Sequence, residues 1–403
     1  MKETAVIEGG VTAPGGFRAA GVHCGIKAEK PDLALIVSDR PAAIAGVFTT
    51  NRVQAAPVRI CREKLAGRTA RAIVINSGSA NACTGAAGRA DAEEIVRVTA
   101  ELLGVEPAVV FPCSTGTIGR RLPVDKIKAG LELAVGELSA AGGAAAARAI
   151  MTTDTVPKQY AVRFEVEGRQ LSIGGMAKGA GMIEPNMATM LAFLTTDAPV
   201  EAQGLQAAVK RAVDAGFNRI SVDGDRSTND TVLAIANGAS GGEVLSPGHT
   251  GWPVFCSALE DVSRRLAFEI VRDGEGATRF VTVSVAGAAS HADADRAARA
   301  VANSLLVKTS WYGGDPNWGR VIDAVGYSGA DVDESRVEIA YDGVCAVLGG
   351  TAAPGVTQED LGRVIRRRAF AVEINLHLGN GEAVVYTCDC SEEYVRINSA
   401  YMT

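Results

Sequence analysis

Residues 178–189 read KGAGMIEPNMAT and lie between two apolar segments, 171–176 and 190–195, whose composition predicts strands. The glycines and the proline of this segment allow backbone conformations that other residues rarely adopt. A strained peptide bond before a threonine can be cut when the threonine hydroxyl attacks the preceding carbonyl and water resolves the ester. A cut between Ala188 and Thr189 would leave a chain whose first residue, Thr189, has an α-amine with an ordinary pKa of about 7.7–8.0. Such an amine can activate its own hydroxyl as a nucleophile.

Taken alone, a threonine at the start of a strand is most often an ordinary strand residue. The whole segment, however, closely resembles the self-processing segment of the ornithine acetyltransferase family of arginine biosynthesis. Further segments resemble the same family in the same order along the chain: 9–14, 114–119, 221–225, 272–278, 315–320 and 394–398. The resemblance therefore covers essentially the whole chain. It implies an α/β (α+β) fold, a layered sandwich of two stacked sheets flanked by helices.

Composition agrees with a large folded protein. The chain has 403 residues, of which 47% are hydrophobic, and a net charge of −6 with 5% aromatic residues argues against a nucleic-acid surface. The polar N-terminus and the lack of an uncharged apolar run of ~18 residues predict a cytoplasmic protein without a membrane segment. The eight cysteines form no paired framework, so we expect them to be reduced.

Strand and helix patterns alternate along the chain, which predicts a mixed α/β fold. Apolar runs predict strands, and the last two are expected to form a hairpin through Gly379-Asn380-Gly381: 33–37, 45–49, 72–75, 108–112, 161–166, 171–176, 190–195, 231–236, 280–285, 337–340, 371–377 and 383–387. Apolar residues at helical spacing predict helices over 91–103, 124–138, 201–215, 254–271, 292–305 and 358–367. Residues 140–149 fit a loop or a weak helix. The cut would give an α chain, residues 1–188, and a β chain, residues 189–403, which we expect to share one structural unit.

No metal or cofactor is expected. The four histidines stand apart, without the spacing of a zinc site. Residues 223–229 imitate the start of a calcium loop, but Thr228 and Ala234 stand where such a loop needs glycine and glutamate. Glycine-rich loops with the spacing of a nucleotide site are also lacking.

Three positions could carry chemistry besides Thr189. Thr115-Gly116 follows an apolar strand, and a glycine there lets a backbone N–H approach a developing oxyanion, although a plain turn is the simpler interpretation. Lys178 could bind a carboxylate or keep a nearby amine deprotonated, and its alternative is a solvated loop lysine. Glu275 follows a long helix in a glycine-rich turn, where it could hold a substrate ammonium or stand as an exposed carboxylate.

The family resemblance assigns roles to these residues. Thr115 and Gly116 would stabilise the oxyanion, and the substrate contacts would come from Thr152, Lys178, Thr189, Glu275, Asn398 and Thr403. Thr153 could replace Thr152 in that role.

The sequence thus predicts an acyltransferase with an N-terminal threonine nucleophile. It would move an acetyl group from N2-acetyl-L-ornithine to Thr189 and from there to L-glutamate, with ping-pong kinetics. Acetyl-CoA is left open as a second acetyl donor. The resemblance also implies a heterotetramer of two α and two β chains. The alternatives are a self-processing aminopeptidase or amidohydrolase of related fold, and a catalytically silent metabolite-binding protein.

Overall fold

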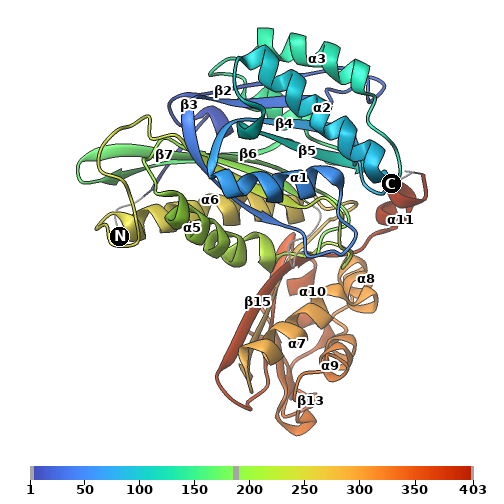
Figure 1. Ribbon diagram of the computed structural model, residues 1–403. Coiled ribbons are helices and arrows are strands. Elements are labelled where there is room, and N and C mark those ends of the chain that lie inside the picture. Colours follow the sequence, from blue (N-terminus) through green and yellow to red (C-terminus); the bar gives the residue numbers. More distant parts are fainter. Residues whose placement is uncertain (1–3, 185–189, 401–403) are drawn as a thin grey trace. The chain divides into compact units, whose positions relative to one another are not determined.

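The computed structural model describes residues 4–184 and 190–400, and these form two compact units (Figure 1). Unit 1 contains the chain up to residue 218 together with 225–270, and unit 2 contains 219–224 and the chain from 271 onward. Each unit has its own sheet and its own helices, so the mixed α/β class is confirmed. Among the described residues, no helix is both long enough and apolar enough to cross a membrane.

Unit 1 is built on a nine-stranded sheet in the order β1-β6-β7-β8-β9-β3-β4-β5, with β2 paired to β3. The pairs β4/β5 and β8/β9 are parallel, and the other pairs are antiparallel. The strands are β1 (Ala5–Ile7), β2 (Phe17–Val22), β3 (Leu33–Phe48), β4 (Thr69–Ser79), β5 (Val110–Thr117), β6 (Lys158–Val166), β7 (Arg169–Lys178), β8 (Leu191–Thr196) and β9 (Thr231–Ala236).

The long strand β3 divides this sheet into two layers. Its first part pairs with β2 and its last part with β9, while its pairing with β4 shifts register between Val37 and Ala42. Such a bulge bends a strand and increases its twist. Both halves contribute to one buried cluster, which includes Ile36, Ile73 and Phe111 from one half and Met176, Phe193 and Leu233 from the other. The stacked layers of unit 1 are therefore two halves of one continuous sheet.

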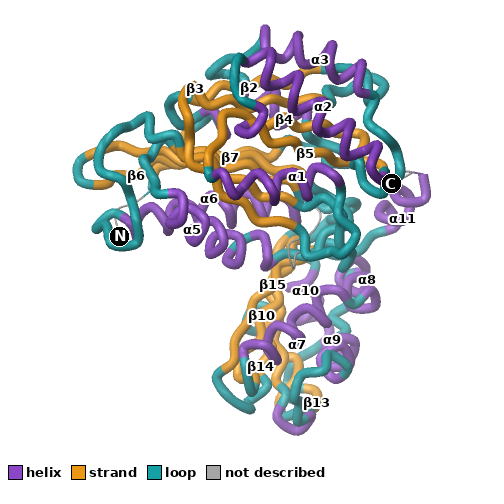
Figure 2. The backbone as a smooth tube through the Cα atoms, viewed as in Figure 1, coloured by secondary structure: helices purple, strands orange, loops and turns teal. Residues whose placement is uncertain are grey.

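Helices cover the outer face of each layer (Figure 2). On one side, α2 (Gly85–Leu103) and α3 (Val124–Gly136) bury Ile95 and Leu131 against the first half of β3 and β4. On the other side lie α5 (Ala202–Ala215) and α6 (Trp252–Arg272). The Gln206 side chain of α5 exchanges two hydrogen bonds of 3.0 Å with the backbone of Gly46. Two shorter helices, α1 (Ala56–Lys64) and α4 (Gly143–Ala149), complete the unit, and α4 shows that the 140–149 segment is helical in part.

Unit 2 is a six-stranded sheet in the order β13-β12-β11-β14-β10-β15. The strands are β10 (Phe280–Ala288), β11 (Glu338–Tyr341), β12 (Val344–Leu348), β13 (Thr351–Ala352), β14 (Ala369–Asn375) and β15 (Gly381–Cys388). Four helices, α7 (His291–Asn303), α8 (Leu305–Gly313), α9 (Trp318–Gly326) and α10 (Gln358–Ile365), contribute to a core centred on Trp311, Tyr341 and Phe370, and α11 (Glu392–Ala400) follows the last strand.

The predicted hairpin of the last two strands is wrong. Strand β10 lies between β14 and β15, so that Phe280 faces Ala369 on one side and Cys388 on the other. Two strands separated by a third lie about 10 Å apart, a span that the residues between Asn375 and Gly381 can cross. The Gly-Asn-Gly sequence therefore ends a crossover connection in this fold, and the apolar strand β10 is buried between two partners.

Candidate functional site

The end of β5 places Thr115 and Gly116 beside the end of β4. Gly116 has φ 128°, a conformation that favours glycine, and a Cβ atom there would lie 2.4 Å from the carbonyl carbon of Gly78. Thr115 is 8% exposed. The chain therefore requires glycine at position 116 for backbone reasons, and the backbone of β5 approaches β4 more closely than a side chain would permit. The oxyanion role of the pair stays a prediction.

Lys178, at the end of β7, reaches the same place. It is 4% exposed, and its Nζ donates a hydrogen bond of 3.4 Å to Oγ1 of Thr115, a residue 63 positions earlier in the chain. The alternative of a solvated loop lysine is therefore wrong. A buried ammonium group is costly unless it is paired, so this part of unit 1 must supply negative charge.

Asp154 supplies that charge. Its Oδ1 accepts a 2.6 Å bond from Nζ of Lys158 and a 2.7 Å bond from the N–H of Gly179, and its Oδ2 accepts a 2.9 Å bond from the N–H of Thr152. Burial acts to raise the pKa of this carboxyl, but the charges of Lys158 and Lys178 and the N–H of Gly179 outweigh it and hold the pKa below its usual range. The buried aspartate thus fixes the backbone directly after Lys178, at Gly179, and directly after Met151, at Thr152. Sequence analysis missed it, although the four-residue spacing of Asp154 and Lys158 was visible.

A third lysine adjoins this network. Nζ of Lys27 donates to the carbonyls of Pro31, at 2.9 Å, and Met151, at 2.5 Å, and so ties residues 27–31 to the segment that carries Thr152. The turn before it is organised by Asp32, whose carboxylate accepts three backbone N–H groups. Burial lowers the pKa of Lys27 to about 8, and the Lys178 charge adds to that effect, while Asp32 and Asp154 act in the opposite direction.

Asp230, the residue before β9 (Thr231–Ala236), is a second buried acid in this region. It is 1% exposed, and neither carboxylate oxygen has a hydrogen-bond partner in the described parts of the chain. Burial raises the pKa of this carboxyl well above its usual value, although the Lys178 charge partly offsets the shift. Burial of Asp230 therefore favours the protonated, uncharged form of its carboxyl more than water would.

In unit 2, the structure brings Glu275 and Asn398 together. Glu275 is 8% exposed, and its Oε2 accepts a 2.7 Å bond from Nδ2 of Asn398 in α11. The alternative of an exposed turn carboxylate is therefore wrong. The next residue, Gly276, has φ 69°, and a Cβ atom there would lie 2.6 Å from Oγ of Ser391, so the turn is packed directly against the segment before α11.

Several predicted positions are not covered by the structure. Ala188, Thr189 and Thr403 lie outside the described residues, so the cut, the nucleophile and the contact at the end of the chain stay predictions. Of the other predicted residues, unit 1 contains Thr115, Gly116, Thr152 and Lys178, and unit 2 contains Glu275 and Asn398.

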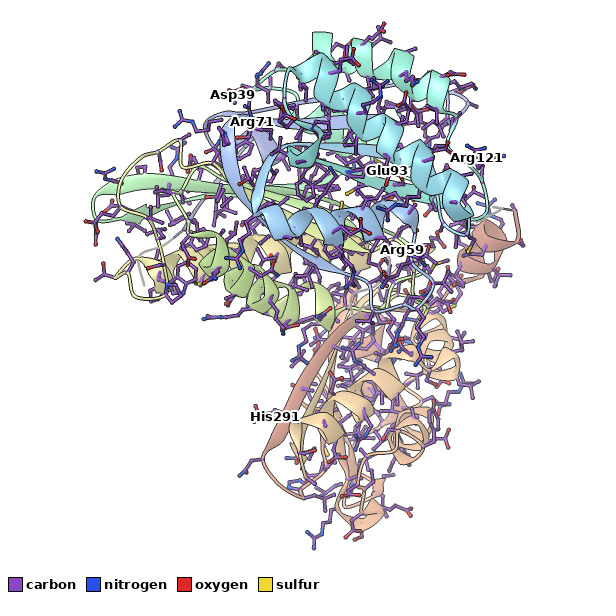
Figure 3. All side chains as sticks on the ribbon, in the orientation of Figure 1. Asp39, Arg59, Arg71, Glu93, Arg121 and His291 are labelled. Atoms are coloured by element: carbon purple, nitrogen blue, oxygen red, sulfur yellow. The ribbon has the colours of Figure 1, made fainter. Side chains whose placement is uncertain are left out.

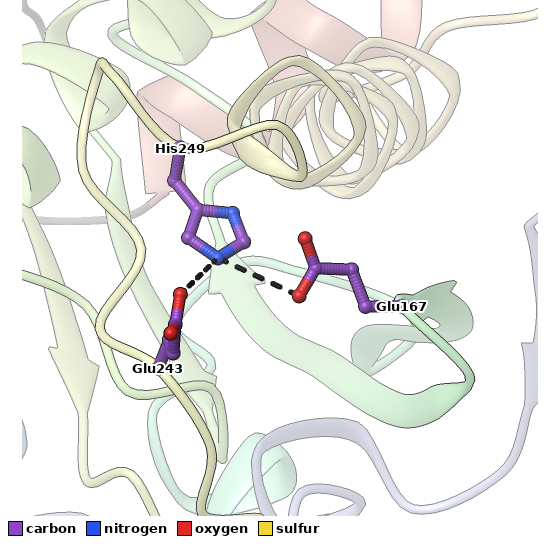
Figure 4. Close-up of side chains that lie close together, drawn as sticks. All are labelled: Glu167, Glu243 and His249. Atoms are coloured by element: carbon purple, nitrogen blue, oxygen red, sulfur yellow. Dashed lines mark ion pairs between the residues drawn. The ribbon is translucent and has the colours of Figure 1, made fainter.

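One group of side chains has the composition of a metal site. Atoms of Glu167, Glu243 and His249 lie within 4.8 Å of one another (Figure 4). Nδ1 of His249, however, accepts a 2.9 Å hydrogen bond from the N–H of Gly251. A ring whose Nδ1 is an acceptor carries its proton on Nε2, and this is the nitrogen that faces the carboxylates of Glu243 and Glu167, at 3.6 and 3.9 Å. A protonated nitrogen cannot bind a metal ion, so the group is explained by contacts between the ring N–H and the two carboxylates.

Comparison with known proteins agrees with this architecture. Residues 18–403 match the sequence profile of the ArgJ family. The arginine biosynthesis bifunctional protein ArgJ of Geobacter sulfurreducens is 52% identical over 391 residues, which cover 96% of this chain and 99% of that protein. Its counterpart in Symbiobacterium thermophilum is 49% identical over 400 residues, covering 98% and 99% of the two chains.

A solved structure is also similar. The crystal structure of the arginine biosynthesis bifunctional protein ArgJ from Bacillus halodurans has 41% identity and a TM-score of 0.51, and it covers 53% of this chain and 100% of the solved chain. The fold and these relatives define an acetyltransferase of arginine biosynthesis. The chain belongs to the ArgJ family.

Proposed function

We propose that this enzyme transfers an acetyl group from N2-acetyl-L-ornithine to L-glutamate through an acetyl ester of Thr189, after the chain cuts itself between Ala188 and Thr189. The observation that carries the proposal is the buried contact between Lys178 and Thr115, which joins two predicted site residues 63 positions apart. Lys178 also ends the strand that leads into residues 179–189.

The proposed reaction has two displacement steps. The α-amine of Thr189 takes the proton of its own hydroxyl, and the oxygen attacks the acetyl carbonyl of acetyl-ornithine. The oxyanion that forms accepts hydrogen bonds from Thr115 and from the N–H of Gly116, and such donors are worth about 3–4 kcal/mol each in other enzymes. Collapse of the intermediate passes the proton to the leaving amine and releases ornithine. The amine of glutamate then attacks the ester carbonyl, the bond from that carbon to the Thr189 oxygen breaks, and the amine's proton passes through the Thr189 α-amine to this oxygen, which releases acetyl-glutamate and restores the threonine.

The charged residues support this sequence of steps. A positive charge near the α-amine of Thr189 favours the neutral form that acts as a base, and Lys178 is the buried cation that would supply it. Lys178 could alternatively bind a substrate carboxylate. Glu275 presents a buried carboxylate, which suits the ammonium group of either substrate. Asn398 presents an amide, which suits a substrate carboxylate.

The lengths of the pieces support the proposed cut. Residues 189–403 make up 215 of the 403 residues, about 53% of the chain. The solved Bacillus halodurans chain is matched over its whole length and covers the same share of this chain. We further propose that two α and two β chains form a heterotetramer. We also propose acetyl-CoA as a second acetyl donor, since the relatives are named bifunctional and a second donor would give this enzyme a second activity.

The first test is the intact mass of the purified protein, with N-terminal sequencing of its pieces. The proposal requires two pieces, one of which begins with Thr189-Met190. Thr189→Ala must give one uncut chain without acetyl transfer, and Thr189→Ser must restore part of the cutting. An uncut, active wild-type chain would overturn the mechanism. Release of ornithine that does not depend on added glutamate would instead favour the amidohydrolase alternative.

A further inference from the structure

A cavity of about 470 Å³ lies in unit 1 at the first turns of α1 and α2. Its volume is within the range of sites that hold small organic ligands. It contains none of the residues discussed so far. Its wall includes three arginines, Arg52, Arg59 and Arg89, together with Gly85 and Ala86 from the start of α2. Figure 3 labels Arg59 on α1 and Glu93 on α2, the two helices that border the cavity.

The arginines of this cavity fall into two kinds. The Arg89 guanidinium is held by both oxygens of Glu63, at 2.8 and 2.7 Å, and by Glu93 at 2.8 Å. Arg52 and Arg59 are exposed, and within residues 4–184 and 190–400 neither guanidinium has a hydrogen-bond or ion-pair partner. The cavity therefore has two unpaired guanidinium groups beside one that is neutralised and fixed in place. A guanidinium binds phosphate through two parallel hydrogen bonds, which makes an anionic ligand the natural occupant.

The start of α2 is also favourable for an anion, although a helix start alone would not establish an anion site. Its N-cap residue, Thr84, makes no side-chain hydrogen bond to the first turn, and its hydroxyl donates to Oδ1 of Asn81 at 2.7 Å. A Cβ atom at Gly85 would meet no atom within 4 Å, so the space in front of the turn is open. The N–H groups of a first helical turn favour negative charge, and two residues of this turn, Gly85 and Ala86, line the same cavity as the arginines.

The cavity is connected to the end of β5 through backbone hydrogen bonds. Cys83 lines the cavity, and the carbonyl of Ala82 before it accepts a 2.9 Å bond from the N–H of Gly119. The N–H of Ala80 donates to the carbonyl of Thr117 at 3.0 Å. The segment that forms the cavity wall thus runs beside the strand end that carries Thr115 and Gly116.

We propose that this cavity binds the phosphate groups of a nucleotide-sized ligand, with Arg52 and Arg59 as the phosphate contacts. In acetyl-CoA the phosphates and the acetyl group stand at opposite ends of a long flexible arm. The wall of this cavity runs beside the strand end that carries Thr115, so both ends of such a ligand would lie on unit 1. This assignment of the ligand to acetyl-CoA rests on the proposed function, whereas the phosphate site itself does not.

The test is calorimetric titration of the wild-type protein with coenzyme A, ATP and inorganic phosphate as probes. We expect coenzyme A to bind, its affinity to fall with added salt, and the double variant Arg52→Glu/Arg59→Glu to weaken it at least tenfold. The matched control is Arg40→Glu, a charge reversal at an exposed arginine of β3, next to Asp39, which Figure 3 shows well apart from Arg59. The control must bind like the wild type, and Arg52→Gln/Arg59→Gln must show an intermediate loss if folding is intact.

Kinetics then identify the ligand. The double variant must raise the KM for acetyl-CoA at least tenfold, by a larger factor than the KM for acetyl-ornithine. Tighter binding of ATP than of coenzyme A would overturn the assignment to the acetyl donor. Failure of all three probes to bind, or equal binding by the wild type and the double variant, would overturn the phosphate site. The titrations do not require turnover. They can therefore show no binding of coenzyme A in a protein that transfers acetyl groups from acetyl-ornithine to glutamate, and they can show binding in a protein that does not.

Discussion

Replacing Lys158 by methionine should destabilise unit 1 far more than a similar replacement at the surface. Lys158 and Asp154 are joined at 2.6 Å, and both side chains are fully buried. Removal of one partner of a buried pair leaves an uncompensated charge and costs about 3–5 kcal/mol. Because Lys178 also lowers the pKa of Asp154, we expect the lower half of that range. The matched control is Lys210→Met, which removes a 2.8 Å pair with Asp214 of the same four-residue spacing, with side chains 70% and 48% exposed.

Urea-induced unfolding followed by circular dichroism measures the difference. An exposed pair contributes about 0–1 kcal/mol, so at a slope of about 3 kcal/mol per M the control should move the midpoint by less than about 0.3 M. On the same slope, Lys158→Met should lower the midpoint by about 1 M or slightly more. Adding Asp154→Asn to Lys158→Met should recover part of the loss, because the buried charge is then gone. Equal shifts for the two single variants would refute the role of burial.

Three further predictions concern other parts of the molecule. Gly116→Ala should abolish acetyl transfer, because the new Cβ would collide with the backbone of Gly78 2.4 Å away, and full activity in that variant would contradict the close approach. Lys27 has a folded-state pKa of about 8 against an ordinary 10.5, so the unfolded chain binds more protons between those values and stability should rise from pH 8 to 10.5. Lys27→Met should remove that rise in the midpoint of urea unfolding, and an unchanged slope would show that another group causes it. Trp311→Ala should cost unit 2 about 3–5 kcal/mol, measured as a lower thermal midpoint, since Trp311 is fully buried.

Hydrophobic periodicity predicted several helices well and the pairing of strands poorly. Predicted helices over 201–215 and 254–271 agree closely with α5 and α6, whose apolar residues recur at helical spacing. Strand pairing depends on which segment takes the neighbouring place in the sheet, and no local pattern records that. β10 therefore came between two strands that had been predicted to form a hairpin. The two strands predicted over 33–37 and 45–49 are one strand, β3, because a bulge carries the chain through its polar middle.

For the candidate site, too, some features could be predicted from the sequence and others depended on the fold. Sequence motifs pointed to Lys178 and Glu275, but only burial excluded their alternative interpretations as exposed charges, and burial is a property of the folded chain. Asp154 and Lys158 were missed for a related reason. A carboxylate and a lysine four residues apart are common on exposed surfaces, and only the fold turns this pair into the buried anchor of Lys178.

The position of β8 in the sheet of unit 1 has a consequence for how the molecule can be made. β8 pairs with β7 from Ile173 opposite Thr196 to Lys178 opposite Leu191, and with β9 on its other side. A gene divided between residues 188 and 189 would encode two polypeptides that meet in the interior of one sheet. Each, made alone, would expose an apolar strand edge of the kind that aggregates. The two halves would have to be synthesised together in one cell, whereas a chain that folds before it is cut never exposes those edges.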